Sequence, residues 1–314
     1  MRISIVIPTR NGEQQLRELL AALKLQTLVP DEIIVIDSSS TDGTVAVAGE
    51  YGAHVKIIER SSFDHGSTRT MGARMAENDI VVYLTQDVLP RNRRLLEHLV
   101  APLAASPAIS VTYGRQLPSF EASEIAAHLR LFNYPETSAT RSFSDRNSLG
   151  LKTVFASNSC AAYRKSALGD IGYFPGGLIF GEDSWAAGRL LEAGFELAYV
   201  AEAEVYHSHN YSWTEDFSRY FDIGVFHQDQ RWLIETFGGA DRRGLAYIRS
   251  GITYLCNRRK YSMLGDFMVR VGVKFIGYRL GRLYKIIPRS LASRLSMNSN
   301  WWRKDKDAER LNQQ

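Results

Sequence analysis

Several carboxylates in this sequence have the positions and spacing to do chemistry. Asp37 and Asp87 each follow a short run of apolar and β-branched residues, so each is expected at the end of a strand. Glu182 and Asp183 open a predicted helix, where the helix dipole stabilises negative charge. Carboxylates placed in this way can bind a divalent cation or act as a general base. The alternative for Asp37 and Asp87 is ordinary turn chemistry, and for the helix-start pair it is the dipole alone.

Two histidines, His207 and His209, end another predicted strand with one residue between them. Alternate residues of a strand point the same way, so the two imidazoles face one side. Neutral imidazoles in this arrangement could bind a divalent metal. The alternative is an unliganded pair of surface histidines.

A polar connector at residues 63–69 combines a carboxylate, an imidazole, a glycine and an arginine where a helix is expected to begin. Backbone N–H groups at a helix N-terminus, together with Arg69, would suit a diphosphate. A capped loop with a surface arginine is the alternative.

The elements that must position these residues alternate along the first half of the chain. Strands are expected at 3–8, 32–37, 54–59 and 79–85, and helices at 13–26, 41–51 and 67–77. This alternation predicts right-handed βαβ units and an open α/β sheet with a parallel core. Ligands of such sheets bind beyond the carboxyl ends of the strands, so Thr9, Asp37 and Asp87 are expected along one edge.

The second half of the chain is less regular. A strand is expected at 109–115, an irregular, partly helical insertion at 119–150, a helix at 182–193, and strands at 195–200 and 204–207. Beyond residue 212 the pattern is helical. We therefore expect a first domain at 1–240 and a helical extension at 241–314.

Composition excludes several classes of protein. The chain has 314 residues, of which 45% are hydrophobic and 23% charged, values typical of globular domains rather than disordered or fibrous chains. Cys160 and Cys256 lie too far apart to indicate a disulfide framework or a cysteine zinc site. The first residues lack a signal-peptide pattern, so a cytoplasmic setting is expected.

The C-terminal extension is strongly basic. Residues 242–314 carry 17 Lys/Arg and 4 Asp/Glu, whereas the rest of the chain carries 21 and 30. Within it, apolar residues recur at helical spacing, namely Val269, Val273, Ile276, Leu280, Leu283 and Ile287. Cations are expected on the opposite side of this helix, namely Arg270, Lys274, Arg282 and Lys285.

Five Lys/Arg between 263 and 287 argue against a membrane-spanning helix. We expect residues 263–289 to lie on an anionic membrane surface. The alternative is that the apolar stripe packs on the rest of the protein while the cations are solvated. No nucleic-acid-binding motif accompanies the charge, so no nucleic-acid partner is expected.

Taken together, four motifs resemble the family 2 glycosyltransferases of the GT-A fold. They are Ile-Val-Ile-Pro-Thr-Arg-Asn-Gly at 5–12, Ile-Asp-Ser-Ser-Ser-Thr-Asp-Gly-Thr at 36–44, the Asp87 position, and Gly-Glu-Asp at 181–183. Phe-Asp-His-Gly-Ser-Thr-Arg at 63–69 and Leu-Thr-Gln-Asp at 84–87 look like the bacterial rhamnosyltransferase branch. The resemblance covers residues 1–235 and leaves the basic extension outside.

The resemblance implies a role for particular residues. The nucleotide-sugar would be held by Thr9, Asp37, His65, Arg69 and Gln86. Asp87 and His207 would bind Mg²⁺ or Mn²⁺, and Asp183 would be the catalytic base. The motif at 85–87 reads Thr-Gln-Asp and so lacks the first carboxylate of the family's Asp-X-Asp, which leaves fewer charged metal ligands.

The implied activity is inverting transfer of a sugar, with L-rhamnose from dTDP-rhamnose as the expected donor. The expected acceptor is a saccharide on a polyprenyl-diphosphate lipid in O-antigen or related polysaccharide assembly, with 119–150 on the acceptor side. The protein would then lie peripherally on the inner face of the bacterial cell membrane. Alternatives are a UDP-hexose-dependent transferase, a non-catalytic membrane-bound scaffold, and a nucleotidyltransferase, whose glycine-rich loop is poorly matched at 10–12.

Overall fold

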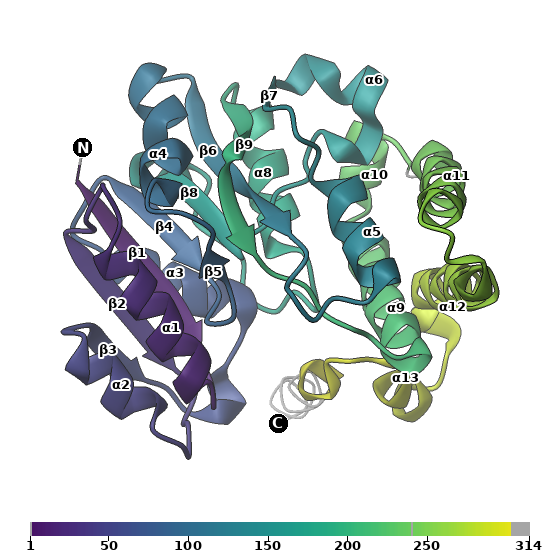
Figure 1. Ribbon diagram of the computed structural model, residues 1–314, viewed down its shortest axis with the longest axis horizontal. Coiled ribbons are helices and arrows are strands. Elements are labelled where there is room, and N and C mark those ends of the chain that lie inside the picture. The colour runs from purple at the N-terminus through teal and green to yellow at the C-terminus, as the bar shows by residue number, and fades with distance from the viewer. Residues whose placement is uncertain (1, 240, 303–314) are drawn as a thin grey trace, which may run out of the picture.

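A central sheet organises the computed structural model, which describes residues 2–239 and 241–302 (Figure 1). The strand order is β3-β2-β1-β4-β8-β6-β9-β5, with β7 also pairing with β9. The first four strands are parallel to one another and comprise β1 (Ile3–Thr9), β2 (Glu32–Asp37), β3 (His54–Ile57) and β4 (Ile80–Leu84). They alternate with α1 (Glu13–Lys24), α2 (Thr44–Glu50) and α3 (His65–Met75). The predicted α/β fold and the alternation of the first half are confirmed.

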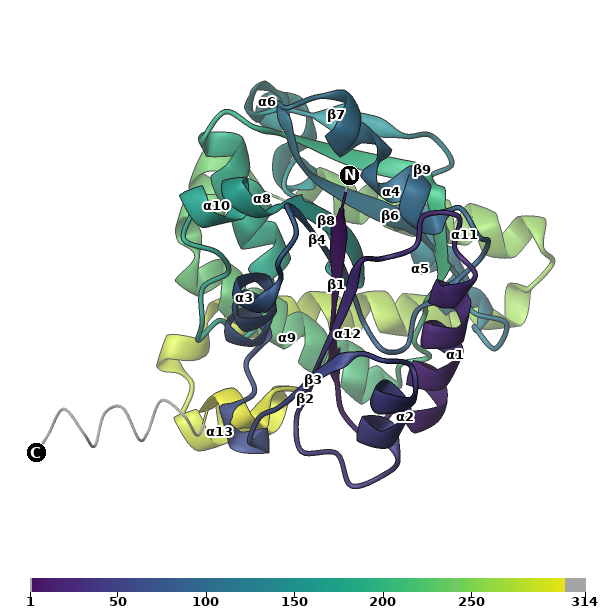
Figure 2. The ribbon, with the colours of Figure 1, turned by 90° about the vertical axis from the view of Figure 1, so that its left-hand side faces the viewer.

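Each face of this sheet carries its own hydrophobic core, because successive side chains of a strand point to opposite sides. Ile5 and Ile7 of β1 pack with the leucines of α1, whereas Val6 between them packs with Ala73 of α3. Figure 2 shows α1 and α3 on opposite sides of the sheet. Burial on both faces explains why β1 and β4 are largely apolar, whereas the edge strand β3 is mostly exposed and carries His54 and Lys56.

The second half completes the sheet. Its elements are β5 (Leu89–Pro90), α4 (Leu95–Ala105), β6 (Ile109–Leu117), α5 (Glu124–Asn133), β7 (Ala139–Arg141), α6 (Arg146–Leu149), β8 (Cys160–Arg164), α7 (Lys165–Asp170), α8 (Glu182–Glu192) and β9 (Glu196–Tyr206). The segment 119–150 contributes α5, α6 and β7, and β7 pairs antiparallel with β9.

The prediction of two strands at 195–200 and 204–207 is wrong. One continuous strand, β9, runs through both, and its pairing with β6 shifts register where Gly114 pairs with Val200 and Arg115 with Glu204. Residues 201–203 of β9 have no partner in β6 at this shift and form a β-bulge. The interruption in the apolar pattern therefore marks a bulge rather than the end of a strand.

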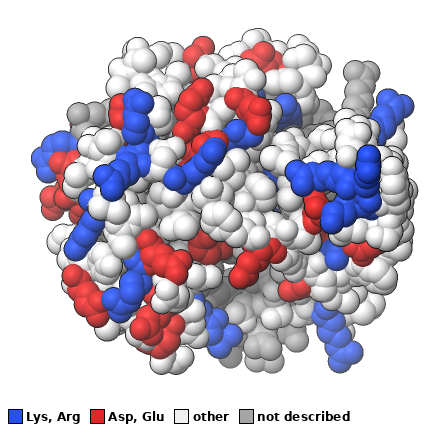
Figure 3. Space-filling view, in the orientation of Figure 1, with Lys and Arg blue, Asp and Glu red and all other residues white. Residues whose placement is uncertain are grey.

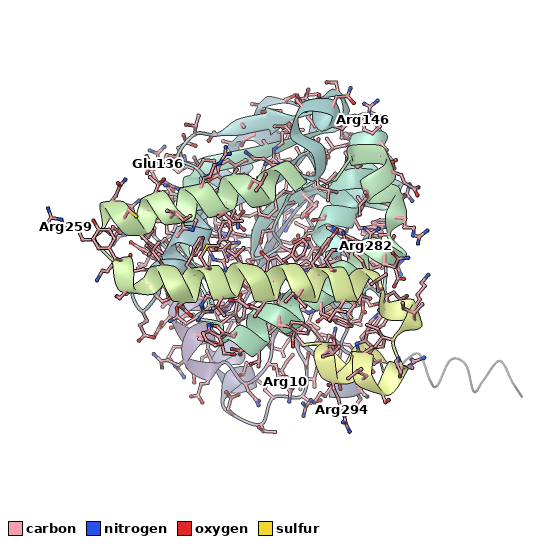
Figure 4. All side chains as sticks on the ribbon, turned by 90° about the vertical axis from the view of Figure 1, so that its right-hand side faces the viewer. Arg10, Glu136, Arg146, Arg259, Arg282 and Arg294 are labelled. Atoms are coloured by element: carbon pink, nitrogen blue, oxygen red, sulfur yellow. The ribbon has the colours of Figure 1, made fainter. Side chains whose placement is uncertain are left out.

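The α-helices that follow within the described residues are α9 (Trp213–Asp229), α10 (Arg231–Phe237), α11 (Asp241–Asn257), α12 (Leu264–Arg282) and α13 (Arg289–Leu295). Figure 4 shows α11 and α12 side by side, with the loop that carries Arg259 joining them at one end. Glycines let α12 approach α9 closely. A Cβ at Gly277 would lie 2.5 Å from the Phe217 carbonyl oxygen, and one at Gly281 would collide with the Phe221 carbonyl oxygen.

We predict that Gly281→Leu destabilises the protein by at least about 2 kcal/mol, because overpacked side chains must push α12 away from α9. Urea unfolding followed by circular dichroism measures the change. The matched control is Gly272→Ala in the same helix, where an added Cβ meets nothing within 4 Å. The control should be neutral or stabilising by up to about 1 kcal/mol. Equal unfolding midpoints for both variants would contradict this account of the contact.

The alternative for α12, in which its apolar stripe packs on the protein and its cations are solvated, is wrong for Arg270 and Lys274. Arg270 Nη1 lies 2.8 Å from Asp216 Oδ2 and Lys274 Nζ lies 3.4 Å from Asp216 Oδ1, so both cations face the protein. Asp216 is itself buried on α9 and requires compensating charge. Spacing alone separates the two sides of a helix but does not say which one faces inward.

The outward side of α12 and of the turn that follows it is apolar instead. We call its members the outer stripe, namely Met268, Val269, Phe275, Ile276, Leu283 and Ile286. Their exposures run from 41% for Val269 to 79% for Ile286. Exposed basic residues at 258–260 lie at one end, and Figure 3 shows basic side chains gathered at the right-hand edge, over α11 and α12. No helix within 2–239 or 241–302 has the length and apolarity to cross a bilayer.

The extension is continuous with the rest of the protein. Ala292 of α13 and Trp302 belong to the same core cluster as the sheet residues Tyr83 and Tyr163. The division at residue 240 remains an expectation, and its last part, 303–314, lies outside the described residues.

Candidate active site

A cavity of about 730 Å³ opens at the carboxyl edge of the sheet. It lies where β4 and β9 end and where α8, α9 and residues 297–301 approach that edge. Five of the predicted site residues line it, namely His65, Arg69, Asp87, Asp183 and His207. Thr9, Asp37 and Gln86 are not part of its lining.

Those three residues lie at neighbouring strand ends, and hydrogen bonds connect the loops that follow these strands. Thr9 and Asp37 are paired in register, and Thr9 Oγ1 donates to Asp37 Oδ1 at 3.1 Å. Asp37 is fully buried and also accepts from the Ser40 backbone N–H at 2.8 Å, which is the turn chemistry weighed as the alternative. The Gln86 side chain forms two hydrogen bonds with the backbone of Arg10. Its Oε1 accepts from the N–H and its Nε2 donates to the carbonyl oxygen. Their roles in nucleotide binding stay predictions.

Asp87, His207 and His209 come together in the cavity. Asp87 Oδ2 lies 3.3 Å from His207 Nε2 and 3.7 Å from His209 Nε2. One ligand atom from each residue lies within 4.8 Å of the others. Asp87 precedes β5 and the histidines follow β9. Because β5 pairs with the end of β9, Leu89 with Tyr206, Asp87 and His207 come together although they lie 120 positions apart.

Gln116 fixes the orientation of His207. The Gln116 amide oxygen lies 2.9 Å from His207 Nδ1 and accepts from Arg130 Nη1 at 2.6 Å. Because this oxygen only accepts, Nδ1 must carry a proton. In the neutral imidazole, Nε2 then presents a lone pair to the Asp87 carboxylate, an arrangement that a shared cation or a proton would stabilise.

The donor set fits a divalent cation. One carboxylate and two imidazoles suit Mn²⁺ better than Mg²⁺, which prefers oxygen ligands. Burial opposes the ionisation of Asp87, but the hydrogen bond and charge of His207 outweigh it and hold the pKa of Asp87 well below its usual range. The carboxylate is thus charged and available as a ligand.

Glu182 and Asp183 begin α8 after a glycine that no other residue replaces easily. Gly181 has φ +77°, and a Cβ there would lie 2.6 Å from the Phe226 ring. The turn directs Glu182 inward, where Oε1 forms a buried ion pair with Arg69 Nη1 at 3.1 Å. Asp183 is only partly buried and faces the cavity.

The two adjacent carboxyl groups have opposite shifts in pKa. Burial, followed by the negative charge of Glu182, raises the pKa of Asp183 to about 7. For Glu182, burial is outweighed by the positive charges of Arg69 and His65, which lower its pKa. Asp183 is therefore a carboxylate poised to exchange a proton near neutral pH.

We predict that Arg69→Met destabilises the protein by about 3–5 kcal/mol, because it leaves the Glu182 charge buried without a partner. Chemical unfolding measures this loss. The double variant Arg69→Met with Glu182→Gln should recover most of it, because the uncompensated charge is gone. Equal stabilities for the single and double variants would show that the ion pair does not carry this energy.

Sequence reasoning missed several residues of the cavity. Gln116, Asn158 and Arg130 carry no motif, and a residue's partners across a sheet depend on a register that spacing does not give. Asn158 supports the acidic pair, since its Nδ2 donates to Glu182 Oε1 at 3.3 Å. Arg219 of α9 also lines the cavity. The sequence around it, which mixes aromatic and acidic residues, gives no motif that would have identified it.

Comparisons with known proteins identify the family of this chain. Residues 4–172 match the family described as glycosyl transferase family 2. The chain is 38% identical over 304 residues to the O-antigen chain rhamnosyltransferase RfbN of Salmonella typhimurium, covering 96% of each chain. It is 39% identical over 301 residues to the O-antigen chain rhamnosyltransferase WbaN of Salmonella anatum, covering 95% of each.

Solved structures share the fold at low identity. A mannosyltransferase from Pyrobaculum calidifontis, in complex with GDP-Man and Mn²⁺, aligns with a TM-score of 0.63 and 16% identity. The alignment covers 91% of this chain and 88% of that one. The mostly parallel sheet with a cavity at its carboxyl edge is thus a GT-A fold, and the protein is a glycosyltransferase. The chain belongs to glycosyl transferase family 2, as the four motifs indicated.

Proposed function

We propose that this protein transfers L-rhamnose from dTDP-rhamnose to a saccharide acceptor carried on a polyprenyl-diphosphate lipid. The observation that supports this most is the similarity to two O-antigen chain rhamnosyltransferases, which extends over at least 95% of the chain at 38–39% identity. Similarity over the full length includes the segments that would meet the acceptor, not only the nucleotide half.

In the proposed reaction, Asp183 takes the proton of the acceptor hydroxyl. The hydroxyl oxygen forms a bond to the anomeric carbon as the bond to dTDP breaks, and the electron pair leaves with the diphosphate. A single displacement of this kind inverts the anomeric centre. The raised pKa of Asp183 suits it to proton transfer near neutral pH.

Asp87, His207 and His209 would hold Mn²⁺, with Mg²⁺ as the weaker candidate for this donor set. A divalent cation there would supply charge stabilisation for the departing diphosphate. The cavity lining is rich in carboxyl groups, which would repel the diphosphate of a bound nucleotide-sugar. A cation there would offset this repulsion. The carboxyl groups of the lining include Asp64, Asp87, Glu182, Asp183, Asp216 and Asp222.

Turnover of purified protein tests the donor. We expect dTDP-rhamnose to be hydrolysed slowly without an acceptor and faster with a lipid-linked saccharide, in each case with Mn²⁺ and not with a chelator. UDP-hexoses are compared in parallel. Preference for a UDP-hexose would replace rhamnose by that sugar, and absence of binding to any nucleotide would favour a non-catalytic scaffold.

We also propose that the outer stripe of α12 rests on an anionic membrane surface at the inner face of the bacterial membrane. Six apolar side chains lie exposed there, beside exposed cations that include Arg279 and Lys285. Apolar side chains flanked by Lys and Arg are the composition of surface-bound helices. Anionic lipid headgroups attract these cations wherever the helix lies on the membrane, whereas a partner protein would need acidic residues at matching positions.

Sedimentation with vesicles tests this location. Wild-type protein should bind vesicles containing phosphatidylglycerol and not those of phosphatidylcholine alone. Phe275→Ser with Ile276→Ser should weaken binding more than tenfold, because each buried side chain contributes about 1.5–3 kcal/mol. The matched control is Leu25→Ser with Val29→Ser, at exposed apolar residues of another surface. A concentration-dependent dimer lost in the first variant, without vesicle binding, would overturn the proposal.

A further inference from the structure

The cavity contains three arginines, and they differ in what they bind. Arg69 is committed to the buried carboxylate of Glu182, at 3.1 Å. Arg130 donates to the neutral amide oxygen of Gln116 at 2.6 Å. Arg219 forms no hydrogen bond and no ion pair with any residue in the part of the chain that the structure describes. The most strongly buried of the three arginines is therefore paired with a carboxylate, and the other two form no ion pair among the residues that the structure describes.

Aromatic rings hold the guanidinium of Arg219 at the cavity wall. Its Cζ lies 5.1 Å from the centre of the Phe180 ring and 5.7 Å from that of Tyr211. Phe180 immediately precedes the Gly181 turn, so this contact connects α9 to the segment that carries Asp183. Stacking on rings fixes the plane of a guanidinium and leaves its N–H groups free to donate.

The two carboxylates that α9 contributes beside Arg219 bind other partners. Asp216, one turn earlier on α9, is paired with Arg270 and Lys274. Asp222, three residues later, accepts from the Met297 backbone N–H at 3.1 Å instead. Burial raises the pKa of Asp222 to about 6, against hydrogen bonds and the charge of Arg219, which lower it.

Arg130 and Arg219 also lie close to the histidine pair. Arg130 donates to the Gln116 oxygen that also contacts His207 Nδ1. Arg219 lies over the ring of Tyr211, whose centre is 5.4 Å from that of the His209 ring. A ligand bound beside Asp87 and His207 would therefore share the cavity with the guanidinium groups of Arg130 and Arg219, which have no carboxylate partner among the described residues. Planar guanidinium forks bind phosphate oxygens in pairs, with more geometric specificity than lysine.

We propose that Arg219, assisted by Arg130, binds a diphosphate in this cavity, a role that sequence reasoning gave to Arg69. The inference rests on the proposed function for its choice of ligand. The diphosphate could belong to the nucleotide-sugar donor or to the lipid that carries the acceptor, since both have the same anionic chemistry. Arg69 instead holds Glu182 and thereby the start of α8.

Binding measurements separate these possibilities. Isothermal titration with Mn²⁺ present would compare dTDP, dTMP and farnesyl diphosphate on wild type, Arg219→Gln and Arg219→Lys. We expect Arg219→Gln to weaken dTDP binding about 10- to 100-fold, as for a charge-assisted hydrogen bond, and dTMP binding by less than about twofold. The affinity of Arg219→Lys for dTDP should lie between those of wild type and Arg219→Gln, because lysine keeps the positive charge but lacks the planar guanidinium group.

The matched control is Arg294→Gln, an exposed arginine on α13 outside the cavity lining (Figure 4). It should bind all ligands as wild type does. Loss of farnesyl diphosphate binding alone would assign Arg219 to the lipid diphosphate. Unchanged binding of dTDP and farnesyl diphosphate, or equal loss of dTDP and dTMP, would overturn the proposal.

Failure of the proposed donor gives a different result. If wild type binds UDP and not dTDP, the donor assignment fails, and the same comparison with UDP and UMP decides the role of Arg219. Because Arg219 has no ion pair or hydrogen bond to lose among the described residues, its variants should melt within a few degrees of wild type. Arg219→Lys, which keeps the positive charge and most of the side chain, provides a second variant in case Arg219→Gln does not fold.

Discussion

Replacing Asp183 by Asn should lower turnover by about 10²–10⁴-fold, the contribution typical of a general base. Asparagine has nearly the shape of aspartate and can still accept from the Ser184 backbone N–H, which lies 2.7 Å from Asp183 Oδ1. It cannot take a proton from an acceptor hydroxyl. The Kd for dTDP should therefore change by only a few-fold, and kcat rather than KM should carry the loss.

The pH profile gives an independent readout. Because burial and the charge of Glu182 raise the pKa of Asp183 to about 7, its carboxylate is protonated and inactive well below that pH. Turnover should rise as pH increases through about 7 and then level off. Asp183→Asn should be slow and lack this rise, while Asp170→Asn, at an exposed aspartate of α7, should behave as wild type. Turnover within a few-fold of wild type in Asp183→Asn would show that the base is another residue.

Replacing Asp87 by Asn should reduce metal-stimulated turnover at least about 100-fold. It removes the one carboxylate of the Asp87–His207–His209 group, and a bound cation contributes several kcal/mol to a reaction that develops negative charge. Electron paramagnetic resonance of added Mn²⁺ measures metal binding directly, without donor or acceptor. The variant should bind Mn²⁺ much more weakly than wild type.

Asp79→Asn is the matched control for this experiment. Asp79 is exposed and lies just before β4, at the opposite end of the strand that Asp87 follows. Gln116→Leu tests the orientation of His207 and should cost about 10- to 100-fold in Mn²⁺ affinity, as loss of an outer-shell partner does. Normal Mn²⁺ binding by Asp87→Asn would exclude Asp87 as a ligand.

The sequence was most informative where strands are buried on both faces. Continuous apolar runs at β1, β2 and β4 fixed the parallel core, and their ends placed Asp37 and Asp87 on one edge. The antiparallel strand β8 was missed, because its Cys-Ala-Ala-Tyr-Arg sequence has few β-branched residues and its place between β4 and β6 depends on distant pairing.

The site was predicted in part for the same reason. Asp87 and His207 are strand-end residues, and the structure brings them to 3.3 Å. The commitment of Arg69 to Glu182 could not be predicted, because it depends on where α8 packs against α3. The orientation of α12 was likewise decided by a carboxylate on another helix, Asp216, and not by the sequence of α12 itself.

The two ends of the chain differ in what an added sequence would disturb. Met297, Asn298, Asn300 and Trp301 line the cavity. Trp301 Nε1 donates to the Gly177 carbonyl oxygen at 2.6 Å, close to the Gly181 turn. Arg2 instead lies at the amino end of β1, on the edge of the sheet away from the cavity. A purification tag at the N-terminus is thus remote from the reaction, whereas a tag or a truncation that disturbs Trp301 would alter the enzyme it was meant to help isolate.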